Sequence, residues 1–352
     1  MKRFFGILSI TLVALTLSAC GGGGGGSNSG APSTQSNSAP LQAHLAVQEA
    51  VTADIPYDVT LLGALDGDSY AVAVNDNGQV VGNYTDRNGR VNAVLWEEGT
   101  PRVVVAGGQA SRVNNLGQVI GCMDPYGYPE AFVYEGTNQV FRLNSIGGSS
   151  QALALNDQGE IAGRITDGGE YAFLDQDGTQ RFIATEVEGY AIAMNNTGQV
   201  LIKRLAADGS FHTLLWQAGT LTDIGTLGGQ STQGRDINDA GQVVGWSQTA
   251  DGQTHACLWE KGVMTDLASL AGEFSAAVAI NNQGQILLKS SDATQNRNLL
   301  YTNGQVLDLG NLGATYAVAN DLNNRGDIVG LMSTASGEIR AFLATPAAGD
   351  SN

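Results

Sequence analysis

The feature that most constrains the fold is a short turn pattern, Asn-x-x-Gly followed by Gln, Glu or Asp, which recurs along most of the chain. The pattern begins at seven positions: Asn75, Asn114, Asn156, Asn195, Asn238, Asn281 and Asn323. Successive copies are 39 to 43 residues apart. Repetition at a period of this length is typical of solenoids and propellers. We therefore expect one array of seven similar units.

The fifth repeat, residues 221–260, shows what one unit contains. Turn signals at 238–241 and 251–252 divide it into short segments that read as strands. Four strands in a unit of about 41 residues fit a propeller blade. A parallel β-helix ranks second because its coils are usually shorter, and two packed sheets would not explain seven equal steps. The prediction is an all-β, seven-bladed β-propeller of four-stranded blades.

The ends of the array predict how the ring closes. If each blade begins with the strand that precedes the motif, the last blade contains only three strands, at 317–323, 327–332 and 340–344. The unused segment 58–63, near the other end, is similar to the fourth-strand segment 222–225. Since an unpaired strand edge is normally covered, we expect segment 58–63 to complete the last blade.

The strand before each motif is rich in alanine. Alanine stands two and four residues before most of the motif asparagines, and larger apolar residues lie between. Because the side chains of a strand alternate between its two faces, both alanines are expected on one small face. The opposite, bulky face would then pack on the small face of the neighbouring blade.

The first residues have the composition of an export signal. Lys2 and Arg3 precede an apolar run of 16 residues, which is short for a membrane span. The sequence Leu-Ser-Ala-Cys at 17–20 resembles the lipobox of bacterial lipoproteins, which implies cleavage before Cys20 and lipid on its thiol. The following residue, Gly21, is not the aspartate linked to inner-membrane retention in enterobacterial lipoproteins. Lipidation at Cys20 is favoured over an ordinary signal peptide or a membrane anchor. In an organism with two membranes, an outer-membrane location facing the periplasm or the surface is favoured.

These features divide the chain into four parts: a lipoprotein signal peptide at 1–19, a lipidated cysteine with a flexible Gly/Ser-rich tether at 20–56, the propeller at 57–346, and a disordered tail at 347–352. Without the signal, 15 basic residues remain against 34 acidic ones. This charge disfavours nucleic acid. The expected partners are a membrane, through the lipid, and an unknown protein or glycan; we expect a monomer without a cofactor.

Residues 225–259 carry a family resemblance. The stretch GTLGGQSTQGRDINDAGQVVGWSQTADGQTHACLW is similar to the HAF-repeat family of predicted extracellular bacterial proteins, named for a His-Ala-Phe tripeptide. Here the tripeptide is His255-Ala256-Cys257, and partial copies contain Ala131-Phe132, Ala172-Phe173 and Ala341-Phe342. The resemblance covers all seven repeats. It implies a repeated β fold and an exported location, and it implies no activity.

No catalytic or metal-binding set emerges from the motifs. His212 and His255 each lie four residues before a tryptophan, but other repeats place Asn, Glu, Tyr or Arg in that position, so it reads as a polar strand position. The recurrent aspartates are explained by turn geometry, and Asp175-Gln176-Asp177-Gly178 lacks the downstream glutamate of a calcium loop. Cys122 and Cys257, three blades apart, are too distant to pair.

The best ligand-binding candidates are residues that break the repeat. Arg112, Asp236 and Asp321 replace the alanine nearest the motif, and Arg235 is adjacent to one of them. These positions would lie near the central channel, although local ion pairing or solvent exposure at its rim is the alternative. Tyr126 and Tyr128 belong to a proline-containing hairpin at 124–129, which could present aromatic rings to a partner or be a variant loop.

Two functions are compatible with these features. The favoured one is an envelope-anchored lipoprotein whose propeller is a binding or scaffold module for an unknown ligand. The alternative is a glycan-active hydrolase or lyase with acidic residues at the channel mouth, which for hydrolysis requires two carboxyl groups about 5 to 9.5 Å apart.

Overall fold

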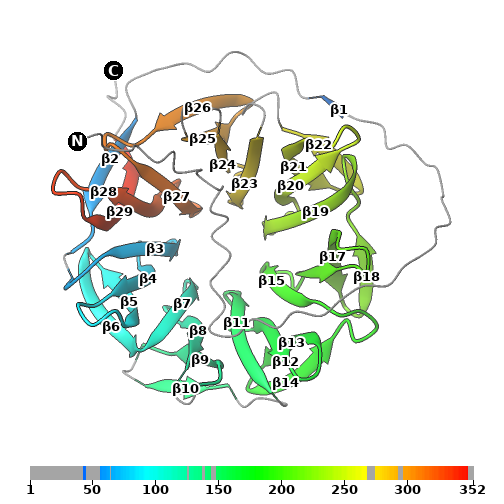
Figure 1. The fold of residues 1–352 in the computed structure, drawn as a ribbon, viewed down its shortest axis with the longest axis horizontal. Helices are drawn as coiled ribbons and strands as arrows, with labels where there is room; N and C mark the ends of the chain where they lie inside the picture. Colours follow the sequence, from blue (N-terminus) through cyan, green and yellow to red (C-terminus); the bar gives the residue numbers. More distant parts are fainter. Residues whose placement is uncertain are drawn as a thin grey trace, which may run out of the picture.

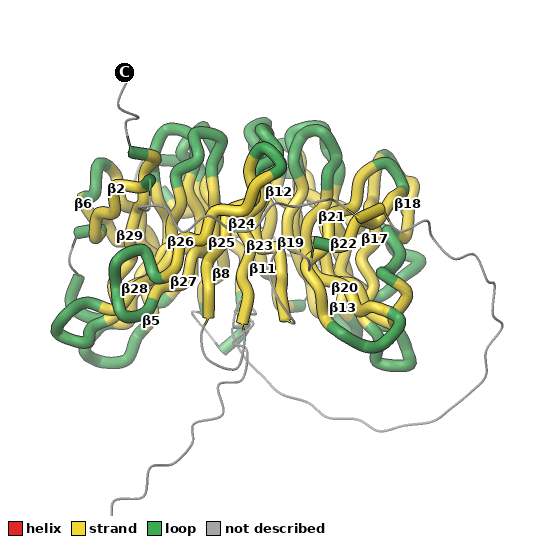
Figure 2. Tube along the Cα trace, turned by 90° about the horizontal axis from the view of Figure 1, so that it is seen from above, coloured by secondary structure: helices red, strands yellow, loops and turns green. Residues whose placement is uncertain are grey.

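The computed structural model describes residues 56–347, except 64, 125–126, 137–138, 144–147, 268–273 and 292–295, together with a two-residue strand at 43–44. Seven four-stranded antiparallel blades are arranged in a ring around a central axis (Figure 1). Seen from the side, the strands lie between two faces formed by loops (Figure 2). The predicted seven-bladed β-propeller is confirmed.

The first four blades follow one another in chain order, each from its inner to its outer strand. Blade 1 consists of β3 (Ser69–Val74), β4 (Val80–Thr85), β5 (Val91–Glu97) and β6 (Thr100–Ala106). Blade 2 consists of β7 (Gly108–Val113), β8 (Val119–Met123), β9 (Glu130–Tyr134) and β10 (Val140–Arg142). Blade 3 consists of β11 (Ser149–Leu155), β12 (Ile161–Thr166), β13 (Glu170–Gln176) and β14 (Thr179–Ile183). Blade 4 consists of β15 (Tyr190–Met194), β16 (Val200–Leu205), β17 (Phe211–Gln217) and β18 (Thr220–Asp223).

The last three blades continue the ring. Blade 5 consists of β19 (Gly228–Ile237), β20 (Val243–Thr249), β21 (Thr254–Glu260) and β22 (Val263–Asp266). Blade 6 consists of β23 (Phe274–Ile280), β24 (Ile286–Ser291), β25 (Asn296–Thr302) and β26 (Gln305–Gly310). Blade 7 consists of β27 (Ala317–Leu322), β28 (Ile328–Ser333), β29 (Ile339–Pro346) and β2 (Tyr57–Leu61). The short strand β1 (Ala43–His44) pairs in parallel with β22.

The N-terminal strand closes the ring. β2 pairs antiparallel with β29, in register from Tyr57 opposite Pro346 to Leu61 opposite Phe342, and Figure 1 shows it beside β28 and β29. The hydroxyl of Tyr57 also donates to the carbonyl oxygen of Gly326 at 3.2 Å. The predicted closure is therefore confirmed, and the outer edge of β29 is covered.

The inner strands differ from the expected alternation because each contains a β-bulge three residues before its motif asparagine. In β3 the register shifts between Ala71 and Ala73. Ala71 packs against blade 7, with Val329, whereas Ala73 packs against blade 2, with Ala110. The prediction of one small face was wrong, because the extra residue reverses the direction of the side chains that follow it.

The hydrophobic cores lie between neighbouring blades rather than on the axis. The phenylalanines of the Ala-Phe copies, Phe132, Phe173 and Phe342, are fully buried on the third strands of their blades, and Cys257 occupies that position in blade 5. Burying a phenylalanine contributes about 2 to 3 kcal/mol. The repeated Ala-Phe pair therefore stabilises the fold. No described segment is a helix of the length and apolarity needed to cross a membrane.

Candidate functional site

The seven motif asparagines form a closed ring of hydrogen bonds. Each is buried, and its Nδ2 donates to the backbone carbonyl oxygen of the motif asparagine in the next blade, at 2.8 to 3.4 Å. The last of these bonds runs from Asn323 back to Asn75. The motif glycines that complete the turns have φ between 76° and 84°, a conformation that glycine adopts without strain. The repeated motif is thus a link between blades.

A second ring lies one residue further along each turn. Its members are Asp76, Asn115, Asp157, Asn196, Asp239, Asn282 and Asn324. Each backbone N–H donates to the side-chain Oδ1 of the next member, at 2.8 to 2.9 Å. The Oδ2 of each aspartate also accepts from an asparagine on either side, as Asp157 does from Asn115 at 3.0 Å and Asn196 at 3.2 Å. The aspartates are held between blades, a role that turn geometry alone did not predict.

These rings line a pocket of about 170 Å³ on the axis, to which all seven blades contribute. We call it the axial pocket. Three of the predicted ligand-binding residues, Arg112, Asp236 and Asp321, line it. They come from blades 2, 5 and 7, so the ring brings together residues that are far apart in the sequence.

Two of the five aspartates that line the axial pocket, Asp236 and Asp321, hold the inner strand of the following blade. Asp236 Oδ2 accepts from the Ile280 N–H at 2.9 Å, and its Oδ1 accepts from the Ile237 N–H at 2.9 Å. Asp321 Oδ2 accepts from the Val74 N–H at 2.9 Å, across the junction where the ring closes. A carboxylate has about four lone-pair positions, so each side chain retains capacity to accept a hydrogen bond from a ligand.

Burial controls the protonation of this pair. It raises the pKa of Asp321 to about 7, a shift that the positive charge of Arg112 opposes and the negative charge of Asp236 reinforces. Burial also raises the pKa of Asp236, against the opposing effects of the Ile280 N–H and Arg112. The charge of the axial pocket therefore changes near neutral pH.

Arg112 is the cationic member of the axial pocket. Its Nη1 donates to the backbone oxygen of the adjacent Ser111 at 2.9 Å. Within the described part of the chain it forms no ion pair. The rim ion pair considered from the sequence is therefore not formed there, and the guanidinium is available to an anionic group.

The other predicted ligand-binding residues lie elsewhere. Arg235 is the extra residue of the bulge in β19 and does not line the axial pocket. Tyr128 is 70% exposed near the start of β9, and Tyr126 lies outside the described residues, as does Cys20. The structure thus brings three of the six candidates into one site.

The histidines connect strands within their own blades. His212 Nδ1 lies 3.0 Å from Asp223 Oδ2, and His255 Nδ1 lies 2.9 Å from Asp266 Oδ2, so each pair joins the third strand to the fourth. This geometry agrees with a structural role. Cys122 and Cys257 are both buried, in blades 2 and 5, and no disulfide joins them.

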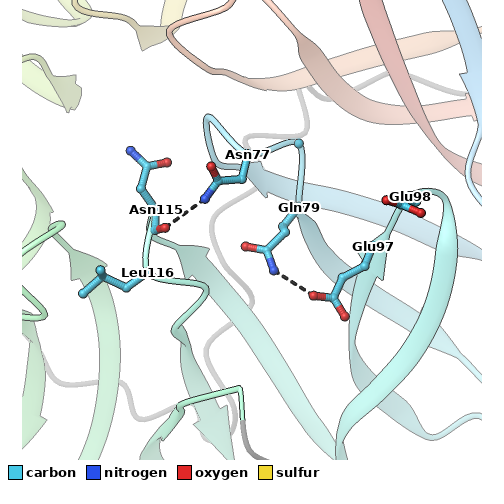
Figure 3. Close-up of a pocket in the computed structure, with 7 residues that line it drawn as sticks. Asn77, Gln79, Glu97, Glu98, Asn115 and Leu116 are labelled. Carbon is cyan, nitrogen blue, oxygen red and sulfur yellow. Dashed lines mark hydrogen bonds between the residues drawn. The ribbon is translucent and has the colours of Figure 1, made fainter.

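A recess of about 450 Å³ between blades 1 and 2 was not found from the sequence (Figure 3). It is lined by Asn77, Gly78, Gln79, Glu97, Glu98, Asn115 and Leu116. Asn77 Nδ2 donates to the Asn115 carbonyl oxygen at 2.9 Å, and Gln79 Nε2 donates to Glu97 Oε1 at 2.8 Å. The pair Glu97-Glu98 was the only sequence signal for it. Because these polar groups bond to one another, the recess is a weaker candidate than the axial pocket.

Comparisons with solved structures place the chain in the β-propeller class. It is similar to the β-propeller domain of the trilobed protease from Pyrococcus furiosus, described as having an open velcro topology, with a TM-score of 0.60, 8% identity and coverage of 81% of this chain and 99% of that one. In the present chain β2 closes the ring instead.

Two peptidases of known structure are also similar in fold. An acylaminoacyl peptidase from Pyrococcus horikoshii has a TM-score of 0.55 at 12% identity, covering 78% of this chain and 51% of that one. A puromycin-hydrolyzing peptidase from Mycobacterium tuberculosis has a TM-score of 0.52 at 10% identity, covering 82% and 51%. At these identities the likeness concerns the fold alone. No protein-family model and no curated protein matches the sequence.

Proposed function

We propose that this protein is an envelope-anchored binding or scaffold module that takes a small polar ligand in the axial pocket. One observation carries the proposal: three charged residues that break an otherwise regular repeat converge from blades 2, 5 and 7 on that pocket. Seven near-equivalent blades offer equivalent surroundings, so selectivity requires departures from the repeat. Concave sites with a few convergent polar groups are the usual places for small ligands.

The three charged residues that break the repeat define the ligand chemistry of the axial pocket, because the ring aspartates Asp76, Asp157 and Asp239 are engaged by neighbouring asparagines. Asp236 and Asp321 suit an ammonium or hydroxyl donor, and Arg112 suits a carboxylate or another anionic group. A small zwitterion satisfies both. The backbone N–H donors that hold the two carboxyl groups fix their positions before the ligand arrives, which lowers the ordering cost of binding.

The test is a thermal-shift and calorimetric screen of free amino acids, amino sugars and polyamines against the full chain in neutral detergent. We expect at least one zwitterionic compound to bind the wild type and to lose binding in Arg112→Ala/Asp236→Ala/Asp321→Ala. Alanine is the residue that all four other blades carry at this position, so the triple variant should still fold. Equal binding by the wild type and the triple variant would place the site elsewhere, with the hairpin 124–129 as the next candidate.

The anchoring part of the proposal rests on the lipobox-like sequence and on the resemblance to the HAF-repeat family. Cys20→Ala should move the protein from the membrane fraction to the soluble fraction after cell lysis. Ser18→Ala is the matched control, because it leaves the thiol in place, and it should remain with the membrane. Unchanged membrane association of Cys20→Ala would contradict lipidation at this residue.

A second candidate function is cleavage of a glycan, as a hydrolase or a lyase. It is favoured by Asp236 and Asp321, two of the carboxyl groups that line the axial pocket; the pKa of Asp321 is about 7, as a general acid requires. Asp321→Asn and Asp236→Asn should each abolish release of reducing ends from a susceptible polysaccharide. Binding without turnover in the wild type favours the module over the enzyme.

A further inference from the structure

Four basic side chains gather at the inner ends of four consecutive blades. Arg164 on β12, Lys203 on β16 and Lys289 on β24 occupy one repeat position, eight residues after the motif asparagine. Arg235 on β19 is the bulge residue of the blade between the last two. In Figure 1 the inner strands of these blades, β11, β15, β19 and β23, form one half of the ring around the axis. The chain has only 17 basic residues and a net charge of −17, so four at one place is a marked concentration.

Tyr190 lies at the centre of this basic cluster. The guanidinium carbon of Arg164 is 5.2 Å from the centroid of its ring, and the Lys203 ammonium is 5.8 Å from the same centroid. Lys203 also lies 4.4 Å from the ring of Phe211. Burial lowers the pKa of Lys203, and the positive charge of Arg235 lowers it further. Arg235 acts on Lys289 in the same way, where burial and this charge lower the pKa to about 8.

Negative charge compensates this cluster only in part, through Glu170, whose charge also acts to raise the pKa of Lys203. The Glu170 carboxylate pairs with Arg164 at 2.8 Å. Within the described ranges, Lys203 and Arg235 form no ion pair, and Lys289 Nζ donates a hydrogen bond to Asn320 Oδ1 at 3.2 Å. The carboxyl group of the neighbouring Asp236 accepts from the Ile280 N–H and does not offset the positive charge of Arg235. Lys203, Arg235 and Lys289 are half-buried, and a cation that is partly removed from water without a counter-charge carries a desolvation cost.

A neutral donor in the same cluster also lacks a partner. Gln151 is 5% exposed, and its Oε1 accepts from Arg164 at 2.9 Å. Its Nε2 is buried and, within the described part of the chain, donates to nothing. A buried amide N–H without an acceptor is rare. After the unpaired positive charges, the Gln151 amide is a second, independent sign that the basic cluster lacks a hydrogen-bond acceptor.

We propose that the basic cluster binds a small oxyanion with at least two negative charges, a phosphate, a sulfate or a polycarboxylate, held by Lys203, Arg235 and Lys289 with the Gln151 amide as a further donor. Oxyanions are the ligands that guanidinium and ammonium groups recognise with charge-assisted hydrogen bonds. This site is separate from the axial pocket, and the inference does not depend on the function proposed above.

The experiment measures binding of sodium phosphate, sodium sulfate and sodium citrate to the full chain at pH 7, by calorimetry and thermal shift, with ionic strength held constant by sodium chloride. Lys203→Gln and Arg235→Gln should each weaken binding by about tenfold or more. Lys261→Gln removes an exposed lysine, with 83% of its side chain accessible, and should bind within about twofold of the wild type. Arg112→Ala/Asp236→Ala/Asp321→Ala should also retain anion binding.

The two substitutions in the basic cluster should not impair folding, because each removes a repulsive charge. Without added anion, Arg235→Gln should melt no lower than the wild type, and Lys203→Gln provides the same test independently. Tighter binding of citrate assigns a carboxylate ligand, and tighter binding of phosphate or sulfate assigns a phosphoryl or sulfuryl ligand. The proposal is overturned if none of the three binds more tightly than chloride, or if Lys261→Gln weakens binding as much as Arg235→Gln does.

Discussion

The hydrogen-bonded ring of asparagines leads to a quantitative prediction for Asn281→Ala. Asn281 is 4% exposed and makes four side-chain hydrogen bonds. Its Nδ2 donates to the Asn323 carbonyl oxygen at 3.0 Å and to Gln285 Oε1 at 2.6 Å. Its Oδ1 accepts from the N–H groups of Gln283 at 3.1 Å and Gln285 at 2.9 Å. At about 1 kcal/mol for each bond, their loss costs about 4 kcal/mol.

Thermal denaturation followed by circular dichroism measures this loss. For a chain of this size, 4 kcal/mol lowers the melting temperature by about 8 °C, at about 2 °C per kcal/mol. Gln283→Ala is the matched control in the same hairpin: its side chain is exposed and makes no hydrogen bond within the described part of the chain. The control should change stability by less than about 0.5 kcal/mol.

A second substitution separates the two halves of the amide. Asn281→Asp keeps the oxygen that accepts from the turn and replaces the donor with an oxygen that faces two other oxygens. At neutral pH we expect it to be at least as destabilising as Asn281→Ala. If both variants melt within error of Gln283→Ala, the ring does not stabilise the propeller and the reasoning is refuted.

Three further predictions concern closure, pH and the histidines. Deleting residues 57–61 should lower the melting temperature sharply because it uncovers β29, whereas deleting five glycines from 21–26 should not; equal effects would contradict closure by β2. The folded pKa of Asp321, about 7 against 3.8, means that its stabilising contribution is full below pH 3.8 and is lost as the pH rises through 7. At 1.36 kcal/mol per pH unit, the lost contribution to the free energy of unfolding is about 4 kcal/mol. The melting temperature of Asp321→Asn should therefore depend less on pH between 4 and 8 than that of the wild type. An unchanged pH dependence would exclude Asp321 as its cause. His255→Asn removes the partly exposed His255–Asp266 pair and should lower the free energy of unfolding by about 1 kcal/mol or less, with phosphate binding intact. Loss of phosphate binding in a folded variant would show that His255 has a functional role.

The sequence alone determined the architecture, because the period of the repeat and the chemistry of its turns are local. Asparagine and glycine at fixed spacing set each hairpin, and the missing fourth strand of the last blade required the segment around Tyr57. Such signals involve residues a few positions apart, or a count of units. These signals can be recognised in the sequence without knowing which blades are neighbours.

The tertiary structure decided which faces and which charges meet. A bulge of one residue sends Ala71 and Ala73 to opposite neighbours, a reversal that strict alternation could not predict. Sequence adjacency grouped Arg235 with Asp236, but the bulge directs the arginine toward the lysines of blades 4 and 6. The basic cluster and the axial pocket assemble residues from different blades, such as Arg112, Asp236 and Asp321, or Lys203, Arg235 and Lys289. Their proximity follows only from the ring, because contacts between blades depend on the packing of one whole sheet against the next.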